Sequence, residues 1–241
     1  MPVLLLATAT EQEAGLLCKI LELEKPAGLL FGKSFRGQHE GLELLIVHHG
    51  VGKVNAAAGL ALAIKETNPR GVIQFGIGGS YPGTSLNVGG IALASKEIHL
   101  DTGVHGDKGW EGMLSMGIPL SHCTPPLYNE FPVDPYLTSV LAKSNNLSTV
   151  IFGTSETVTG TDREAELLRD RFEVSVESME GAAAAQVCHE LGIPFAELRG
   201  ISNIVGVRKR KAWDIPGAIS AVNRAMVKTL STLADEGSYC D

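Results

Sequence analysis

Short apolar runs alternate with longer stretches of helical periodicity along almost the whole chain. A short apolar run between turn residues is typical of a buried strand, and a helix is the usual connection between two parallel strands. We expect strands at Val3 to Ala7, Leu44 to Val47, Gly71 to Phe75, Ile91 to Ile98, Thr149 to Phe152 and Phe195 to Ile201. We expect helices at about Glu11 to Leu23, Lys53 to Lys65, Asp162 to Arg171 and near the C-terminus. The alternation predicts an α/β layered domain around a largely parallel or mixed sheet, and we interpret residues 1 to 241 as a single domain.

The charge balance and the cysteines argue against several classes of protein. A formal net charge of −7 does not suit a protein that gains its affinity by neutralising nucleic-acid phosphates. The 4 cysteines are scattered without a C-x-x-C pair, so the sequence predicts neither a zinc site nor a disulfide framework. Neither a leader pattern nor a long apolar span is found. We therefore expect a cytoplasmic protein without nucleic-acid or membrane partners.

The composition of the chain changes between Asp101 and Pro135, where several glycines are followed by several prolines. The patterns on either side of this segment belong to the same α/β scheme, so a linker between two domains is not indicated. We interpret residues 101 to 135 as a long functional or interfacial loop region.

One segment points to a binding site. In Val174 to Ala185, a β-rich run stops near Glu180, a carboxylate that precedes a helix of very small residues. In an open α/β sheet, ligands bind beyond the carboxyl ends of the strands, which is where this side chain is expected. The structural alternative is that Ser178 caps the helix and Glu180 only complements the helix dipole.

Two further strand ends carry polar residues. Glu13 opens a helix after the first apolar run, and Asn203 follows the last one. Each has a structural explanation, since an acid in the first helical turn complements the dipole and asparagine favours turns. However, Glu13, Glu180 and Asn203 come from separate strand ends of one predicted sheet, so we expect them to converge on one crevice.

The glycine clusters and the histidines exclude several kinds of binding and catalytic site. Gly50 to Asn55 lacks the pattern of a dinucleotide turn or a phosphate-binding loop, so we interpret it as a tight turn before a helix. Gly76 to Ser80 offers several unhindered backbone N–H groups, which suit either a simple turn or the floor of a sugar or anion site. The histidines show neither metal nor triad spacing, and His48 and His49 fit a structural role, so no metal is expected.

Five blocks of sequence carry a resemblance to a known family, and in chain order they are Glu11 to Glu13, Gly50 to Val54, Gly76 to Gly79, Ser178 to Ala182 and Arg199 to Asn203. These blocks resemble the nucleoside phosphorylase and nucleosidase superfamily, and within it most closely the futalosine hydrolases of menaquinone biosynthesis. The similarity covers nearly the whole chain. The futalosine branch is indicated by Glu177 to Gly181, Ser202 with Asn203, and Ala212 to Asp214.

The resemblance implies a three-layer α/β/α sandwich and a cofactor-free cleavage of a purine N-glycosidic bond. Glu180 would then bind the ribose hydroxyls and stabilise the cationic sugar, with Met179 as the apolar surface beside it. Glu13 would orient and deprotonate the attacking water. The loop from Thr8 to Glu13 has no basic residue that could hold phosphate, which favours hydrolysis over phosphorolysis.

One departure from the adenine-cleaving relatives predicts the leaving base. They carry an aspartate where this chain has Asn203, and an amide can donate to a 6-oxo group that an ionised carboxylate would repel. The resemblance therefore implies that hypoxanthine is the base. Further candidate substrate-binding residues are Gly78, Ser202, and Thr157 or Val158 in the wall of the base pocket. Arg208, Arg210 or Arg163 is a candidate to bind the benzoate carboxylate of futalosine.

The resemblance also implies a homodimer or a higher homo-oligomer, with residues 101 to 135 near the interface. Several alternatives stay open. A nucleosidase for methylthioadenosine and S-adenosylhomocysteine, or a purine nucleoside phosphorylase, would have the same fold. A nucleoside-binding protein without turnover and a dinucleotide-dependent oxidoreductase are alternatives from other classes.

Overall fold

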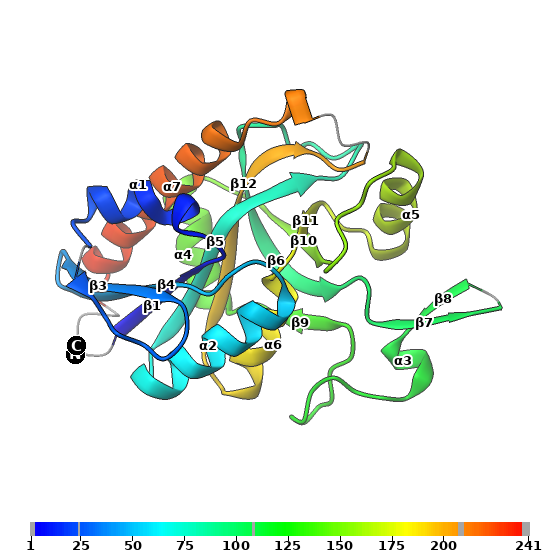
Figure 1. Cartoon of the computed structure of the whole chain (residues 1–241), viewed down its shortest axis with the longest axis horizontal. Coiled ribbons are helices and arrows are strands. Elements are labelled where there is room, and N and C mark those ends of the chain that lie inside the picture. The colour runs from blue at the N-terminus through cyan, green and yellow to red at the C-terminus, as the bar shows by residue number, and fades with distance from the viewer. Residues whose placement is uncertain (1–2, 24, 108, 207–209, 238–241) are drawn as a thin grey trace.

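The computed structural model describes residues 3–23, 25–107, 109–206 and 210–237, and within them one large mixed sheet runs through the molecule (Figure 1). Its strand order is β11-β10-β6-β12-β5-β1-β4-β3-β2, and β9 pairs with β6. The strands are β1 (Val3–Thr8), β2 (Lys25–Pro26), β3 (Lys33–His39), β4 (Leu42–His48), β5 (Gly71–Ser80), β6 (Ile91–His99), β9 (Glu130–Pro132), β10 (Thr149–Thr154), β11 (Val176–Ser178) and β12 (Phe195–Ile204).

Helices cover both faces of the sheet. They are α1 (Glu11–Ile20), α2 (Lys53–Thr67), α4 (Pro135–Asn145), α5 (Asp162–Phe172), α6 (Gly181–Glu190) and α7 (Ile215–Asp235). Along β1, Leu4 and Leu6 pack in one core with α1, α4 and α7, while Leu5 and Ala7 pack in the other with α2 and α6. Because successive side chains of a strand point to opposite faces, a strand buried on both sides is apolar throughout. The predicted three-layer α/β/α sandwich is confirmed.

The sheet curls at one end and closes on itself. The end of β5 pairs antiparallel with β11, so that Val176 faces Ser80 and Glu177 faces Gly79. The pairings of β5 with β12, β12 with β6, β6 with β10 and β10 with β11 complete the ring. This closure brings β11 and the start of α6 next to the carboxyl end of β5.

The segment from 101 to 135 is more regular than the sequence predicts. It contains a two-stranded ribbon of β7 (Gly103–Gly106) and β8 (Gly109–Gly112), followed by the short helix α3 (Met113–Met116) and by β9. The prediction of a long functional or interfacial loop region missed this regular structure, because tertiary contacts stabilise the ribbon. The ring of Trp110 packs edge-on against Phe172 with centroids 5.0 Å apart, and the Arg171 guanidinium lies 5.3 Å from the Trp110 ring centroid.

Asn223 of α7 ties two helices together at the start of α1. Its side-chain oxygen accepts from the Leu17 N–H at 2.8 Å, and its amide donates to the Glu13 carbonyl at 2.6 Å. An α-helix normally pairs these two backbone groups with each other, so the amide enters the α1 hydrogen-bond ladder. The residue is fully buried, so its hydrogen bonds are shielded from water.

We expect Asn223→Ala to lower the free energy of unfolding by about 1–3 kcal/mol, because buried backbone groups lose their partners. Urea unfolding followed by circular dichroism measures the change. Lys228→Ala, at an exposed position of the same helix, serves as the control and should change stability by no more than about 0.5 kcal/mol. Equal effects of the two substitutions would contradict the assigned role.

Candidate active site

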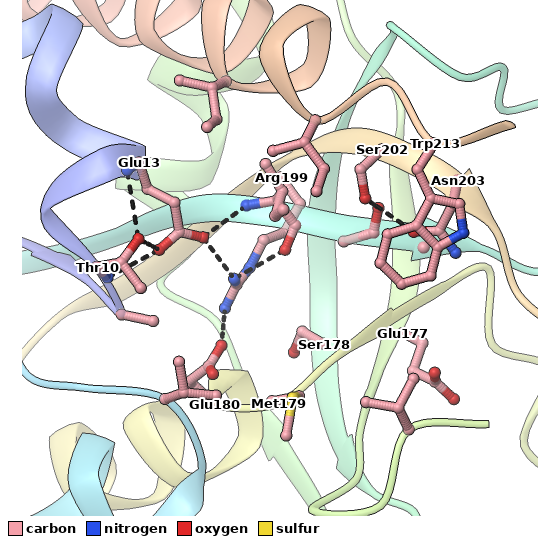
Figure 2. Close-up of a pocket in the computed structure, with 18 of the residues that line it drawn as sticks. Thr10, Glu13, Glu177, Ser178, Met179, Glu180, Arg199, Ser202, Asn203 and Trp213 are labelled. Carbon is pink, nitrogen blue, oxygen red and sulfur yellow. Dashed lines mark hydrogen bonds and ion pairs between the residues drawn. The ribbon is translucent and has the colours of Figure 1, made fainter. Parts of the chain in front are cut away.

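A cavity of about 290 Å³ lies beyond the carboxyl ends of β1, β5 and β12 and beside β11 (Figure 2). This volume is near the lower end of the range for small-molecule sites. The starts of α1, α6 and α7 contribute residues to its wall. The cavity therefore occupies the place where ligands bind in an α/β sheet of this kind.

Glu13 is held at one end of the cavity by a capping box. Its backbone N–H and the Thr10 hydroxyl are 3.4 Å apart, while Glu13 Oε2 accepts from the Thr10 N–H at 2.9 Å. Glu13 Oε1 accepts from the Ile77 N–H at 3.0 Å. A Cβ at Gly76 would lie only 2.4 Å from that oxygen, so the carboxylate needs a glycine beneath it. Glu13 thus both takes part in the cap of α1 and lines the cavity.

Burial raises the pKa of Glu13 above its ordinary value, although the charge of Arg199 and the Ile77 N–H act in the opposite direction. A carboxylate with a raised pKa accepts a proton more readily than an exposed one does. Glu13 is therefore suited to general-base chemistry.

Glu180 lies across the cavity from Glu13, at the residue that precedes α6. Its Oε1 accepts from the Gly52 N–H at 3.1 Å, and its Oε2 accepts from Arg199 Nη2 at 3.0 Å. The helix N-terminus is served by other side chains, because the Gly181 N–H donates to Ser178 Oγ and the Ala182 N–H to Thr154 Oγ1. The alternative that Ser178 is the N-cap was wrong, because Glu180 occupies that position and Ser178 only accepts from the Gly181 N–H. The side chain of Glu180 lines the cavity. The tight turn at Gly50 to Gly52 contributes a donor to Glu180.

Arg199 lies between the carboxylates of Glu13 and Glu180, and its role was not predicted from the sequence. It is 1% exposed, and its guanidinium reaches Glu180 at 3.0 Å, Glu197 at 2.6 Å and Glu13 at 4.0 Å. Burial opposes the charged form, but these carboxylates raise the pKa of Arg199 above its usual value. A glutamate and an arginine two residues apart in an apolar strand share one face, which was a signal for a buried ion pair.

Ser202 and Asn203 occupy the opposite end of the cavity (Figure 2). The register between β12 and β5 shifts here, since Ile201 pairs with Gly78 and Asn203 with Gly79, which leaves Ser202 as the extra residue of a bulge. Ser202 Oγ lies 2.8 Å from Asn203 Oδ1 and 3.1 Å from the Gly78 carbonyl. Asn203 Nδ2 donates to the Ile204 carbonyl at 3.0 Å, and an amide nitrogen carries a second N–H beyond the one that this bond uses.

The remaining walls are mainly apolar. Val158, Met179 and Trp213 line the cavity, and Trp213 was not among the predicted substrate-binding residues. Thr159 donates to the buried carboxylate of Glu177 from both its N–H and its hydroxyl, which fixes the loop that carries Val158. Thr157 is exposed and is not among the lining residues.

The structure therefore brings together most of the predicted site residues. Those that line the cavity are Glu13, Gly78, Val158, Met179, Glu180, Ser202 and Asn203. Among the candidates for the benzoate carboxylate, Arg163 is exposed and outside the lining. Arg208 and the side chain of Arg210 lie outside the described residues.

The described residues contain neither a cluster suited to a metal ion nor a helix suited to a membrane. No group of three or more histidine, cysteine, aspartate or glutamate side chains is placed there to hold a metal ion. None of the helices in the described ranges is long and apolar enough to cross a membrane.

Comparison with known proteins agrees with this geometry. The family model of the phosphorylase superfamily matches residues 3–236. Futalosine hydrolase of Thermus thermophilus is 37% identical over 199 residues, which cover 82% of this chain and 84% of the relative. A 5′-methylthioadenosine/S-adenosylhomocysteine nucleosidase of Bacillus thuringiensis is 30% identical over 216 residues, covering 86% and 87%. The structure of a futalosine hydrolase mutant of Helicobacter pylori has the same fold, with a TM-score of 0.84 at 17% identity and coverage of 96% and 99%.

We expect Arg199→Leu to lower the free energy of unfolding by about 3–5 kcal/mol near neutral pH, because it leaves buried carboxylates unpaired. Without the guanidinium, the pKa values of these carboxyls in the folded variant rise above those in the unfolded chain. The variant therefore loses further stability as pH rises through the raised pKa values, and the deficit is smaller at pH about 5.5 than at pH about 8.

Urea unfolding of the wild type and the variant at both pH values measures this effect. The control is Lys33→Leu, which removes an exposed ion pair with Glu11 and should cost no more than about 1 kcal/mol. A deficit for Arg199→Leu that does not change with pH would show that these carboxylates do not depend on the guanidinium.

Proposed function

The chain belongs to the phosphorylase superfamily, and we propose that it hydrolyses the N-glycosidic bond of futalosine. The products are hypoxanthine and dehypoxanthine futalosine, and the reaction serves menaquinone biosynthesis. The single observation that carries the proposal is that Glu13, Glu180 and Asn203, which are far apart in sequence, line one cavity. We propose that residues 1 to 241 act as one domain, without a metal or a cofactor.

The charge distribution of the site suits the cleavage of a glycosidic bond. In such a reaction, positive charge develops on the ribosyl carbon and negative charge on the departing base. Glu13, Glu180 and Glu197 surround a single guanidinium, so the carboxyl groups of this cluster outnumber its cation. Negative charge on these groups stabilises the cationic sugar. The carboxylate of Glu180 accepts hydrogen bonds from the ribose hydroxyls, and Met179 packs against the ring.

Glu13 acts as the general base in this proposal. Its oxygens already accept from Thr10 and Ile77, which hold the carboxylate at a fixed orientation in the cavity. Glu13 Oε2 accepts from both the N–H and the hydroxyl of Thr10, whereas Oε1 accepts from the Ile77 N–H and has a further lone pair that can accept from a water molecule. Glu13 takes a proton from this water while the oxygen attacks the ribosyl carbon.

Water is favoured over phosphate as the nucleophile. Among the described residues that line the cavity, Arg199 carries the only positive charge, and it is already paired with Glu180 and Glu197. A phosphate dianion would therefore meet carboxylates without a free cation to bind it. This supports hydrolysis.

Asn203 is the proposed specificity determinant for the base. Its free amide N–H donates to N7 or to the 6-oxo group of hypoxanthine, and Trp213 and Val158 provide apolar surface for the purine. An amide cannot act as an acid, so the departing base is stabilised by hydrogen bonding and takes its proton from water.

We also propose that the protein is a cytoplasmic homodimer or a higher homo-oligomer. The support for self-association is a set of large apolar side chains exposed within the segment 101 to 135, namely Val104, Leu114, Met116 and Ile118. The support for a reducing compartment is that Cys18, Cys123 and Cys188 are free thiols.

The proposal predicts the substrate preference of the purified protein. Futalosine should be cleaved with release of hypoxanthine at a rate that added phosphate does not change, and methylthioadenosine and inosine should be cleaved more slowly. Chromatographic measurement of the free base with and without phosphate checks this. Faster release of adenine from methylthioadenosine, or turnover that requires phosphate, would favour the rival enzymes. Binding of nucleosides without any turnover would indicate a nucleoside-binding protein.

Asn203→Asp tests the recognition of the base. An ionised carboxylate would face the 6-oxo group, so kcat/KM for futalosine should fall by roughly 10–100-fold. The loss should become smaller as pH decreases and the new carboxyl takes up a proton. The control is Asn68→Asp, which makes the same change at the exposed end of α2 and should leave kcat/KM unchanged. An unchanged kcat/KM for Asn203→Asp would rule out a contact between residue 203 and the base.

A further inference from the structure

Two more glutamates lie behind Arg199, outside the set of described residues that line the cavity. Glu97 of β6 and Glu197 of β12 are both fully buried. They meet beneath the start of α6, because a Cβ at Gly181 would lie 2.5 Å from Glu97 Oε2 and 2.5 Å from Glu197 Oε2. Two buried carboxyls at one point are costly to the fold unless protons or cations compensate their charge.

Glu197 forms the shortest of the contacts that carboxylates make with Arg199. Its Oε1 accepts from Arg199 Nε at 2.6 Å, whereas Glu180 lies 3.0 Å from Nη2 and Glu13 lies 4.0 Å from Nη1. The Nη1 group that faces Glu13 also donates to the Ile77 carbonyl at 3.0 Å. The guanidinium is thus bound most closely on the side away from the cavity and least closely on the side of the proposed base.

Glu97 is placed where a proton would relieve the repulsion between the two carboxyls. Complete burial, followed by the charge of Glu197, raises the pKa of Glu97 well above its ordinary value, which favours its neutral form. Thr154 Oγ1 donates to its Oε2 at 3.4 Å. A neutral Glu97 has an O–H that can donate to Glu197, so the pair would share one proton and one negative charge.

We propose that Glu197, with Glu97 beside it, is a positioning residue that binds the Arg199 guanidinium on its far side and so keeps Glu13 available as a proton acceptor. This inference rests on the proposed role of Glu13 as the general base. Without the charge of Glu197, the guanidinium would be shared between Glu180 and Glu13 alone. A closer cation lowers the pKa of a carboxyl by about 1–3 units, which would weaken Glu13 as a base.

The other groups that act on Glu13 come from each element packed around it. Thr10 of α1 and the Ile77 N–H of β5 lower its pKa by hydrogen bonding, and the charge of Glu180 before α6 raises it. His49, which follows β4, lies behind these groups. Burial lowers its pKa, which favours the neutral form, while the charge of Glu180 raises this pKa and that of Arg199 lowers it. Arg199 is therefore the group whose displacement would change Glu13 most.

Glu197→Gln is the decisive variant, because it keeps the shape and the acceptor for Arg199 Nε but removes the charge. The rate kcat/KM rises with pH as Glu13 loses its proton. We expect this rise to move to lower pH by about one unit in the variant, with a roughly 10-fold lower kcat on the plateau. Affinity for free hypoxanthine, measured by calorimetry, should be unchanged, since the base binds at the other end of the cavity.

Glu97→Gln is the matched control. A neutral Glu97 and a glutamine amide can both donate to Glu197, so the pH profile of Glu97→Gln should stay within about 0.3 units of the wild type. A shift as large as that of Glu197→Gln would overturn the assignment of the proton to Glu97. Glu197→Asp keeps the charge but withdraws it from Arg199, and a smaller shift in the same direction is expected.

A titration of Glu13 in the absence of substrate separates this inference from the proposed function. Carbon-13 NMR of labelled glutamate side chains, with the Glu13 signal assigned by Glu13→Gln, gives the Glu13 pKa directly in the wild type and in Glu197→Gln. A lower pKa in the variant supports the inference even if futalosine is not the substrate. An unchanged Glu13 pKa in Glu197→Gln, with Glu197→Asp also unchanged, would overturn it whatever the enzyme cleaves.

Discussion

The site depends on a buried guanidinium that is shared by three carboxylates. Arg199 contacts Glu13, Glu180 and Glu197, and all four side chains are almost completely removed from water. A buried charge of this kind is stable only when its partners are placed well, so the geometry of the site and the stability of the fold are linked. The same cluster places the carboxyls of Glu13 and Glu180 in the wall of the cavity beside Arg199, and negative charge there suits the cleavage of a glycosidic bond.

Each partner of Arg199 is also held by the backbone of another element. Glu13 accepts from Ile77 of β5, and Glu180 accepts from Gly52 before α2. Asn223 of α7 fixes the first turn of α1, where Glu13 lies. The closure of the sheet through β5 and β11 brings these elements to one end of the molecule. The carboxylates are thus oriented by regular structure, which limits their movement during a reaction.

Most of the layered fold and most of the site could be predicted from local patterns. Apolar runs such as Val3 to Ala7 indicate strands buried on both faces, and polar residues at their carboxyl ends indicate where a ligand binds. This is why Glu13, Glu180 and Asn203 were found before any coordinates. The role of Arg199 was missed because a charged side chain in an apolar strand gives no local sign of which distant groups neutralise it. The ribbon around Trp110 was missed because its stability comes from Phe172 and Arg171, which lie far away in sequence.

The sequence by itself determined the alternation of the main buried strands with helices, because burial on two faces leaves a continuous apolar run in each such strand. It also determined which polar residues stand at strand ends, and the amide at Asn203 in place of an acid. Only the tertiary structure decided how these groups share charge. The bulge at Ser202, the closure of β5 onto β11, and the meeting of Glu97 with Glu197 all depend on contacts between residues far apart in the chain. Such contacts set distances and burial, and these two quantities determine the strength of an ion pair and the pKa of a carboxyl.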